Sequence, residues 1–446
     1  MIWTPVMPDF SAETLKISLP EWSECTWESD SRLRDFSLDS SPSVQAALKA
    51  VNQSGQVEIL EVKHGLIVKT KSHVGRIRIG GLDLTIRPKL PGMKLAALLR
   101  YAYGLRDLKL LSEHTIATAP VAFHDLLALQ LYAEASELVA RGLFRKYQRF
   151  DEDLASPRGR LNIQSIARRG GGGAVATLPC IHHPRSDDCL INRVVLSGLE
   201  LAAGMVNDPE LRLQLRSLSK VISESVTMVG LHRATFRELE RESNRLTAAY
   251  RPAIRLIQLL VESRGITLQN EDLEVQLSGF LFDMNSFFQQ VISRFLREFL
   301  VGHVVLDEVG LKGMMAYVSE FNPQNRKAPS PRPDFVILKN LRVVAILDAK
   351  YRDLWEKSLP RDMLYQLAMY AMGQADCHQA TILYPTMDAT ATESRVAIFD
   401  PVDSKEMGRV GLRPVRIDHL ADLVSTQMVA TNRRACAAFA SSIVFA

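Results

Sequence analysis

Short apolar runs with the alternating spacing of β-strands lie near the start of the chain. His64-Gly65 and Gly80-Gly81 interrupt these runs at the positions expected for tight hairpin turns. A shorter strand is predicted at 15–19. The pattern therefore predicts a small antiparallel β domain whose four strands occupy 57–62, 66–70, 74–79 and 82–86.

This predicted β domain has a basic outer face. Arg76 and Arg78 alternate with isoleucines, so the two arginines share one side of their strand. Arg87 and Lys89 follow the last strand. These charges could contact a protein partner or nucleic-acid phosphates, or they could face only water, and composition does not separate these interpretations.

Longer apolar runs with a helical period fill the middle of the chain. Residues 156–164 interrupt this period and begin an extended segment. The glycine run at 170–173 follows no apolar strand and lacks the Gly-Lys-Ser/Thr ending of a phosphate-binding loop, so we expect a flexible loop there. Helices are predicted over 93–104, 124–148, 190–206, 209–222 and 244–263.

The last part of the chain alternates strands with helices. Two strands joined by a tight turn at Lys339-Asn340 are followed by a helix and then a further strand, which Pro385 ends. Because a helix that connects two parallel strands makes a right-handed crossover, we expect a mixed central sheet. The other elements expected are a helix at 283–300, strands at 304–309, 314–318, 380–384 and 395–399, and a helix near 418–423.

The hairpin in this region carries the chemistry. Asp334 stands at the start of its first strand, and Asp348 and Lys350 stand at the end of its second. Antiparallel pairing brings these two ends together, and residues two apart project from the same face of a strand. Two carboxylates and an ammonium therefore converge at one sheet edge. Paired carboxylates suit a hard cation such as Mg²⁺, so the pattern indicates metal-assisted phosphodiester hydrolysis.

Composition and length set the frame for this site. The 446 residues exceed one ordinary core, and 47% hydrophobic with 23% charged residues is typical of a globular protein with two or three domains. A net charge of +4 permits contact with nucleic acid without requiring it. The five scattered cysteines argue against a disulfide framework, and no apolar run reaches membrane-spanning length. We therefore expect a cytoplasmic protein.

A second cluster, from residue 180 to residue 189, contains two cysteines and two histidines. Its spacing is not that of a usual zinc finger. Ser186, Asp187 and Asp188 instead lie where a side chain can cap the helix that follows. We therefore favour helix capping over a zinc site that would use Cys180, His182, His183 and Cys189.

The hairpin residues resemble those of the PD-(D/E)xK nuclease superfamily. Pro333-Asp334 matches the Pro-Asp pair, and Asp348-Ala349-Lys350 matches the acidic-x-Lys element. Gln366 and Tyr370, four apart on the next predicted helix, share one helical face. A Gln-x-x-x-Tyr helix after the lysine strand is typical of the RecB-like branch of these nucleases. The combination is more specific than an isolated Asp-x-Lys, which is usually a solvated strand end.

Further blocks resemble the McrC family, whose members are nuclease subunits of the McrBC modified-cytosine restriction system. The resemblance covers about residues 56–400. The blocks are moderately specific singly and strong as an ordered set. They are Val74-Gly75 to Ile79 with Ile86 to Leu90, Arg158-Gly159-Arg160, Asp187 to Leu190 with Asn192-Arg193, and Asp283-Met284-Asn285.

This resemblance implies an α+β multidomain chain with a C-terminal α/β nuclease core of PD-(D/E)xK type. The β-rich and helical part before the core would dock on a hexameric AAA+ GTPase of McrB type and stimulate its hydrolysis. The partner, not this chain, would bind GTP and recognise the methylated DNA in phage defence. The segments expected are an N-terminal extension (1–55), a β-hairpin domain (56–92), a mostly helical docking region (93–270), the nuclease domain (271–400) and a C-terminal extension (401–446).

The resemblance also implies roles for individual residues. Asp334, Asp348 and the Ala349 carbonyl would bind Mg²⁺. Lys350 would orient or deprotonate the attacking water, and Gln366 and Tyr370 would position DNA or the lysine. The expected contacts to the partner or to DNA are Arg76, Arg78, Arg87, Lys89, Arg158, Arg160 and Arg332.

One position departs from the family pattern. Many members carry a glutamate on the helix after the Met-Asn pair, where this chain has Gln289. Glu308 and Glu320 are the candidates to supply the missing charge. The change favours one rival function, a non-catalytic activator of an AAA+ partner with a decayed nuclease site. A second rival is a stand-alone RecB-like DNA nuclease, which would cut without nucleotide or partner.

Overall fold

The computed structural model describes residues 14–105, 123–169, 176–263, 267–270, 273–276, 278–373, 378–425 and 432–445. The chain forms two compact units, one of residues 1–123 with 263–446 and one of residues 124–262. Helices and several separate sheets confirm the expected mixture of α and β structure. The five finer segments drawn from the sequence stay predictions. Among the described residues, no helix combines the length and apolar composition needed to span a bilayer.

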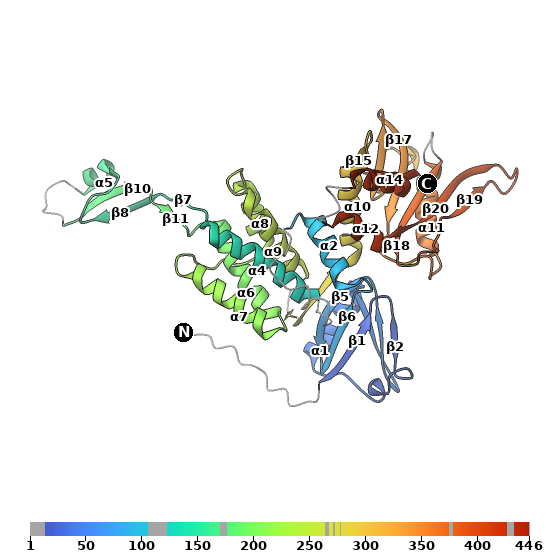
Figure 1. Cartoon of the computed structure of the whole chain (residues 1–446), viewed down its shortest axis with the longest axis horizontal. Coiled ribbons are helices and arrows are strands. Elements are labelled where there is room, and N and C mark those ends of the chain that lie inside the picture. The colour runs from blue at the N-terminus through green and yellow to red at the C-terminus, as the bar shows by residue number, and fades with distance from the viewer. Residues whose placement is uncertain are drawn as a thin grey trace. The chain divides into compact units, whose positions relative to one another are not determined.

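Two small sheets form the N-terminal part of the first unit (Figure 1). Buried side chains such as Ile59, Val68 and Leu84 join the sheets in one apolar core. The strands predicted here from alternation are confirmed. One sheet has the order β2 (Glu24–Thr26), β4 (Gly65–Thr70), β3 (Val57–Val62), and the other has the order β1 (Leu15–Pro20), β6 (Leu82–Arg87), β5 (His73–Ile79), β14 (Ser278–Asp283).

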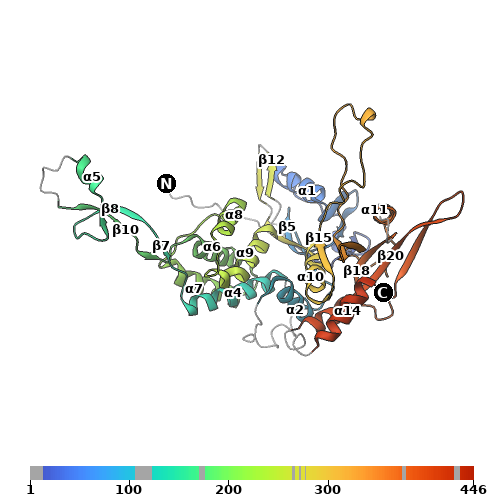
Figure 2. The same ribbon diagram turned by 90° about the horizontal axis from the view of Figure 1, so that it is seen from above.

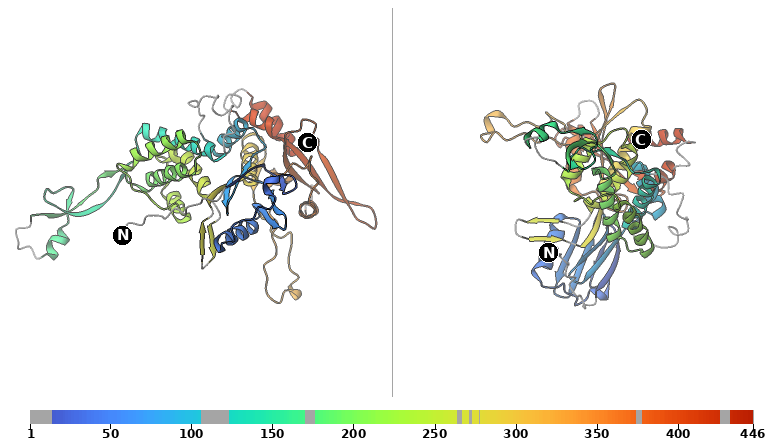
Figure 3. Two further views of the ribbon diagram at one scale, coloured as in Figure 1. Left: turned by 90° about the horizontal axis from the view of Figure 1, so that it is seen from below. Right: turned by 90° about the vertical axis from the view of Figure 1, so that its left-hand side faces the viewer.

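The expected all-antiparallel pairing of this region is wrong. β1 runs parallel to β6, with Leu15 opposite Leu82. β14 comes from much later in the sequence and pairs with β5, with Leu281 opposite Gly75. Helix α1 (Pro42–Ser54), which was not predicted, packs on β3 and ends at Gly55 in the left-handed conformation. The hairpin of β12 (Thr267–Asn270) and β13 (Leu273–Gln276) lies beside α1 (Figure 3).

A mixed sheet forms the C-terminal part of the first unit. β17 (Arg342–Ala349) and β18 (Gln379–Thr386) run parallel, with helix α11 (Arg361–Met372) between them in sequence, as the crossover pattern predicts. The other helices of this unit are α2 (Gly92–Tyr103), α10 (Met284–Phe299), α12 (Ile417–Val424) and α14 (Arg433–Phe445). The sheet order is β15 (Val304–Asp307), β16 (Phe335–Lys339), β17 (Arg342–Ala349), β18 (Gln379–Thr386), β20 (Glu406–Arg416), β19 (Ser394–Phe399).

Two predictions for this sheet are wrong. Residues 314–318 form no strand, so the chain between β15 and β16 is a long excursion, drawn in orange in Figure 2. Pro385 does not end β18, which continues to Thr386. β17 pairs with β18 only as far as Leu383, while β20 continues beside it to Thr386. Pro385 therefore lies beyond the β17 ladder and removes no hydrogen bond from it.

The second unit is a helical bundle with an extended arm (Figure 1). The bundle contains α4 (Phe123–Arg141), α6 (Leu190–Met205), α7 (Pro209–Ser223), α8 (Arg233–Glu242), the 3₁₀ helix η2 (Ala248–Tyr250) and α9 (Arg251–Ser263). β7 (Lys146–Tyr147) pairs with β11 (Arg185–Ser186) at the base of the arm. The outer part of the arm contains β8 (Phe150–Leu154), β10 (Leu178–His182), β9 (Arg160–Leu161) and α5 (Ile163–Arg168).

The helices predicted in this unit are confirmed in place but not in every boundary. The helix predicted over 124–148 ends at Arg141, because Gly142 has a φ of 87° and turns the chain into the arm. The helix predicted over 244–263 begins only at Arg251, after η2. Helix α8 was not predicted, and the glycine run predicted as a loop lies outside the described residues.

Candidate active site

The two strands of the predicted hairpin bring three charged side chains together. Phe335 lies opposite Leu347 in the β16–β17 ladder, so Asp334 and Asp348 fall next to each other at the sheet edge. Lys350 Nζ lies 2.8 Å from Asp348 Oδ2 and 3.9 Å from Asp334 Oδ2. The Ala349 N–H donates to Asp334 Oδ2 at 2.7 Å. The convergence predicted from the sequence is therefore present in the structure.

Burial controls the charges of this acid–lysine cluster. Asp348 is only 2% exposed, and Asp334 and Lys350 are partly covered. Burial, followed by the nearby Asp348 carboxylate, raises the pKa of Asp334 to about 6 against the opposing effect of Lys350. Burial opposes protonation of Lys350, but the two carboxylates outweigh it and raise the lysine pKa. The lysine is therefore a cation at neutral pH, beside two acids that compete for it.

Helix α11 places Gln366 and Tyr370 beside this cluster. Gln366 Nε2 donates to Tyr370 OH at 2.7 Å, as their spacing on one helical face predicts. Tyr370 is 2% exposed. Burial raises the pKa of its phenol, and the charges of Asp348 and Asp334 add to that rise. The charges of the two carboxylates therefore act on the phenol.

The two glutamates considered as replacements for a helix carboxylate lie in different places. Glu308 follows β15, its N–H donates to the Asp334 carbonyl at 3.0 Å, and its charge contributes to the raised pKa of Asp334. Gln289, on α10, donates from Nε2 to Glu308 Oε1 at 3.2 Å. Glu320 instead lies exposed in the 3₁₀ helix η3 (Ser319–Phe321), within the orange excursion of Figure 2. The structure thus brings Glu308, and not Glu320, to the cluster.

Three of the basic candidates in the N-terminal sheets, Arg76, Arg78 and Lys89, are paired with acids within the fold. Arg76 and Arg78 both bind Asp83, which is 3% exposed. Burial opposes ionisation of Asp83, but the Arg76 hydrogen bond and the charges of both arginines outweigh it and lower the pKa. Lys89 Nζ lies 3.3 Å from Glu356 Oε2. Arg76 and Arg78 therefore balance a buried acid, a role the alternation pattern did not predict.

The remaining basic candidates are exposed. Arg332 lies on the surface two residues before Asp334, and Arg87 is exposed at the end of β6. On the arm of the second unit, Arg158 and Arg160 flank Gly159, whose φ of 71° brings the backbone close to Ile181.

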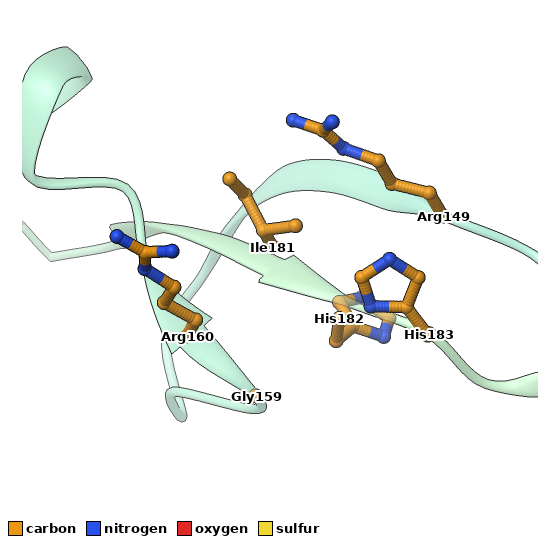
Figure 4. Close-up of a pocket in the computed structure, with 6 residues that line it drawn as sticks. All are labelled: Arg149, Gly159, Arg160, Ile181, His182 and His183. Carbon is orange, nitrogen blue, oxygen red and sulfur yellow. The ribbon is translucent and has the colours of Figure 1, made fainter.

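A cavity of about 370 Å³ opens on the arm, and Figure 4 shows its lining. Of the acids on β8, Glu152 binds His182 at 2.6 Å, Asp151 Oδ2 lies 3.8 Å from Arg149 Nη2, and Asp153 binds Arg169 at 2.9 Å. The cavity wall carries basic side chains, and two of them, Arg149 and His182, are paired with these acids. It consists of Arg149, Gly159, Arg160, Ile181, His182 and His183.

The cysteine–histidine cluster forms no metal centre. Across the described part of the chain, no group of three or more His, Cys, Asp or Glu side chains is arranged to hold a metal ion. The favoured capping role is also wrong in detail, because Cys189 occupies the N-cap of α6 without a side-chain cap. Asp188 instead binds Arg193 at 2.7 Å and accepts from Thr227. The Arg193 hydrogen bond, together with the two hydrogen bonds from Thr227 and the Arg193 charge, lowers the Asp188 pKa to about 2 against the opposing effect of burial.

Asn192, from the block of Asp187 to Leu190 with Asn192-Arg193, joins two chain segments at the base of the arm. Its Nδ2 donates to the Phe144 and Asp187 carbonyls at 2.8 and 2.6 Å, and its Oδ1 accepts from Tyr250 OH at 2.8 Å. The Phe144 N–H donates back to Tyr250 OH at 2.8 Å. These bonds fix both chain segments that leave the bundle for the arm. Tyr250 has no sequence signal beyond its place in an apolar run.

The fold and site define a mixed α/β protein with an acid–lysine cluster where two strands of its main sheet end. The sequence matches the model of a family described as McrBC 5-methylcytosine restriction system component, over residues 68–385. The match covers well over half of the chain. The chain therefore belongs to the McrBC 5-methylcytosine restriction system component family, as the sequence blocks predicted.

Solved structures are similar to this chain in fold. One is the half-complex of Thermococcus gammatolerans McrB AAA+ hexamers with bound McrC, at 21% identity and a TM-score of 0.59, covering 93% of this chain and 99% of that chain. Another is the Thermococcus gammatolerans McrBC complex, at 21% identity and a TM-score of 0.45, covering 64% and 88%. No curated protein sequence matches the chain.

Proposed function

We propose that this chain is the DNA-cutting subunit of a modified-cytosine restriction system, with a nuclease core of PD-(D/E)xK type. The observation that carries the proposal is the cluster of Asp334, Asp348 and Lys350, in which one ammonium lies within 4 Å of two carboxylates. A hydrolase that attacks a phosphodiester needs negative ligands for a cation and a positive group for the developing charge. The cluster contains both.

The donor set fits a magnesium ion. Asp334 and Asp348 are close enough for one to raise the pKa of the other, so the pair carries more negative charge than Lys350 balances. Their carboxylates, with the Ala349 carbonyl, would hold Mg²⁺, a cation that prefers oxygen ligands. Glu308, which accepts a hydrogen bond from Gln289, would support this metal site with a further carboxylate. When bound, the cation would neutralise charge on the scissile phosphate.

The chain's own side chains account for the remaining steps. Lys350 would hold the attacking water and stabilise the additional charge that develops on the phosphate oxygens. Tyr370 would help to orient the lysine from the α11 side, with its phenol held by the 2.7 Å hydrogen bond from Gln366. Arg332, exposed beside the cluster in sequence, would bind a DNA phosphate.

The partner would be an AAA+ GTPase of McrB type. Family membership supports this assignment, and so does the fold similarity to a complex described as McrB AAA+ hexamers with bound McrC. Arg87 and Lys89 of the N-terminal sheets and Arg158 and Arg160 of the arm would contact the partner. Arg76 and Arg78 are weaker candidates, because they already bind Asp83.

Cleavage of methylated plasmid with the cognate GTPase, GTP and Mg²⁺ tests the proposal. Asp348→Asn and Lys350→Ala should lower cleavage by at least about 100-fold, the size of effect seen when one charge-stabilising group is removed. Lys339→Ala is the matched control, since Lys339 is exposed at the turn end of β16. Undiminished nicking by Lys350→Ala would contradict the assignment.

Gln289 favours one rival function, a non-catalytic activator, because it removes a charge from the helix beside the site. An activator would stimulate GTP hydrolysis by its partner but leave DNA intact, and the Lys350→Ala variant would stimulate equally. A stand-alone nuclease, by contrast, would cut without GTP or partner. Omitting each component in turn separates the three functions.

A further inference from the structure

Tyr351, the residue after Lys350, is tied to the N-terminal sheets. Its OH donates to Glu21 Oε1 at 2.9 Å, and its carbonyl accepts from Trp22 Nε1 at 2.8 Å. Its N–H donates to Asn285 Oδ1 at 3.0 Å. The side chain is 8% exposed. Three polar groups of one residue are thus held by groups more than sixty residues away in the sequence.

Glu21 is an unusual partner, because it is a fully buried carboxyl at the end of β1. Its Oε1 accepts from Tyr351 OH and from the Lys89 N–H, the latter at 2.8 Å. Its Oε2 is buried and has no hydrogen-bond partner among the described residues. Burial raises the pKa of Glu21 to about 7, although the hydrogen bonds from Lys89 and Tyr351 and the Lys89 charge oppose the rise. Burying the Glu21 carboxyl with one oxygen unpaired costs stability, so we expect this residue to have a function that offsets the cost.

Trp22, the residue after Glu21, is contacted by side chains from the loop that follows Lys350. Its φ of 57° lies in the left-handed region, which a bulky residue rarely adopts. Lys357 Nζ donates to the Trp22 carbonyl at 2.7 Å. Arg352 and Lys357 lie over the indole ring, at 5.5 and 5.8 Å from its centroid. The loop after Lys350 therefore contacts both the backbone and the ring of Trp22.

A third link runs through the start of α10. Asn285, which accepts from the Tyr351 N–H, donates from Nδ2 to Ser72 Oγ at 2.8 Å. The Met284 N–H donates to the Ser72 carbonyl at 3.0 Å. Ser72 precedes β5, so the second N-terminal sheet is joined to the same strand end.

These links fix the backbone that carries Lys350. The N–H groups of three successive residues are bonded to three different elements: Ala349 to Asp334, Lys350 to the Leu383 carbonyl of β18 at 2.9 Å, and Tyr351 to Asn285. Asp334, just before β16, and Leu383 of β18 hold the first two. Asn285 of α10 holds the third, while Glu21 and Trp22 bond the hydroxyl and the carbonyl of the same Tyr351, so a movement of Glu21 or Trp22 reaches the lysine through one residue.

We propose that Glu21 and Trp22 are positioning residues for Lys350, acting through Tyr351, and that the N-terminal sheets thereby control cleavage. The inference rests on the proposed nuclease function of the acid–lysine cluster. A partner that shifts these sheets would change the orientation of the lysine without touching DNA. The coupling needs no further element, because the hydrogen-bonded path is continuous.

The test uses the full chain in complex with its GTPase, on methylated plasmid with GTP and Mg²⁺. Tyr351→Phe removes one hydrogen bond and keeps the ring, and Trp22→Phe removes the indole N–H while keeping an aromatic ring. We expect each to lower kcat for cleavage about ten-fold to 100-fold, because small misplacements of a catalytic group have effects of this size. KM for DNA and the partner's GTP hydrolysis should change less than about two-fold, since neither residue faces DNA or GTP.

Glu21 offers a rescue experiment. Glu21→Leu should lower cleavage like Tyr351→Phe, while Glu21→Gln keeps a carbonyl acceptor for Lys89 and Tyr351 and should retain most of the activity. Glu61→Leu is the matched control, because Glu61 Oε1 also accepts a backbone N–H, from Leu38 at 2.8 Å, within the same sheets. A merely structural role of Glu21 would lower the stability of Glu21→Leu without lowering kcat of the folded complex.

Amide hydrogen exchange at 349–351 supplies a readout that needs no cleavage. Exchange there should become faster in Tyr351→Phe and Glu21→Leu but not in Glu61→Leu. If these variants cut and exchange like the wild type while Lys350→Ala is inactive, the positioning role is wrong and the nuclease assignment stands. If the wild type never cuts, the nuclease assignment fails, and the exchange data alone decide whether Glu21 holds the strand end.

Discussion

Gln289 donates a hydrogen bond from Nε2 to Glu308 Oε1 at 3.2 Å, so an uncharged helix residue holds a carboxylate beside the acid–lysine cluster. Glu308 has a φ of 49°, in the left-handed region that non-glycine residues rarely adopt. Its N–H donates to the Asp334 carbonyl at 3.0 Å. The charge that the helix lacks is therefore present nearby, supplied from the end of β15.

The first prediction concerns this carboxylate. Glu308→Gln should raise the Mg²⁺ concentration needed for half-maximal cleavage by about ten-fold, a usual cost for loss of a residue that supports metal ligands. A titration of cleavage against Mg²⁺ measures the shift. Glu320→Gln should leave the titration unchanged, because Glu320 is exposed in the excursion before β16. Equal shifts in both variants would mean that Glu308 has no special role.

Tyr370 provides a second prediction. Tyr370→Phe removes the acceptor of the Gln366 hydrogen bond and a hydroxyl near the carboxylates, so cleavage should fall about ten-fold, within the range for a removed hydrogen bond to a charged or polar group. Single-turnover rates with DNA bound measure the effect. Tyr365 lies on the same helix but is 65% exposed, so the single-turnover cleavage rate of Tyr365→Phe should match that of the wild type.

The raised pKa of Glu21 predicts how stability depends on pH. The folded state keeps the Glu21 proton up to about pH 7, whereas the unfolded chain loses it near pH 4.5. Between these values the unfolded state binds fewer protons, so stability falls as pH rises, by about 3 kcal/mol in total for this group. Glu21→Gln has no proton to lose, and this part of the decline should disappear.

Urea unfolding at a series of pH values, with Mg²⁺ removed, measures the decline. Glu61→Gln is the control and should follow the wild-type curve. A Glu21→Gln curve parallel to the wild type from pH 5 to pH 8 would show that the Glu21 carboxyl ionises normally in the fold.

The base of the arm gives a fourth prediction. Asn192→Leu leaves the Phe144 and Asp187 carbonyls and the Tyr250 hydroxyl without their buried partner. The free energy of unfolding should fall by about 2–4 kcal/mol, the usual range when buried polar groups lose their hydrogen bonds. Ser217→Leu, at an exposed position on α7, should change it by less than about 0.5 kcal/mol. Similar losses in both variants would contradict the role of Asn192.

Much of the candidate site followed from sequence because its geometry is local. A short turn fixes the register of β16 against β17, and this register alone brings Asp334 beside Asp348 and Lys350. The four-residue spacing of Gln366 and Tyr370 likewise fixes their contact within one helix. The family was also evident, since its blocks are short sequence motifs that stand in order.

Errors arose where neighbours far apart in sequence decide the outcome. Residues 314–318 have a strand-like composition but no strand to pair with, and Pro385 stays in β18 because β17 ends before it. Arg76 and Arg78 look like a free basic face in the alternation pattern. In the structure they neutralise Asp83, which faces them across the β5–β6 pair.

The sequence by itself determined many of the strands, most helices, the family and the acid–lysine hairpin, because these depend on residues a few positions apart. Only the tertiary structure decided that β1 lies parallel to β6, that β14 completes the same sheet, and that Glu21 meets Tyr351. Such contacts join segments between 67 and 330 residues apart. No local period or spacing encodes them, because they arise from how the sheets pack once they have formed.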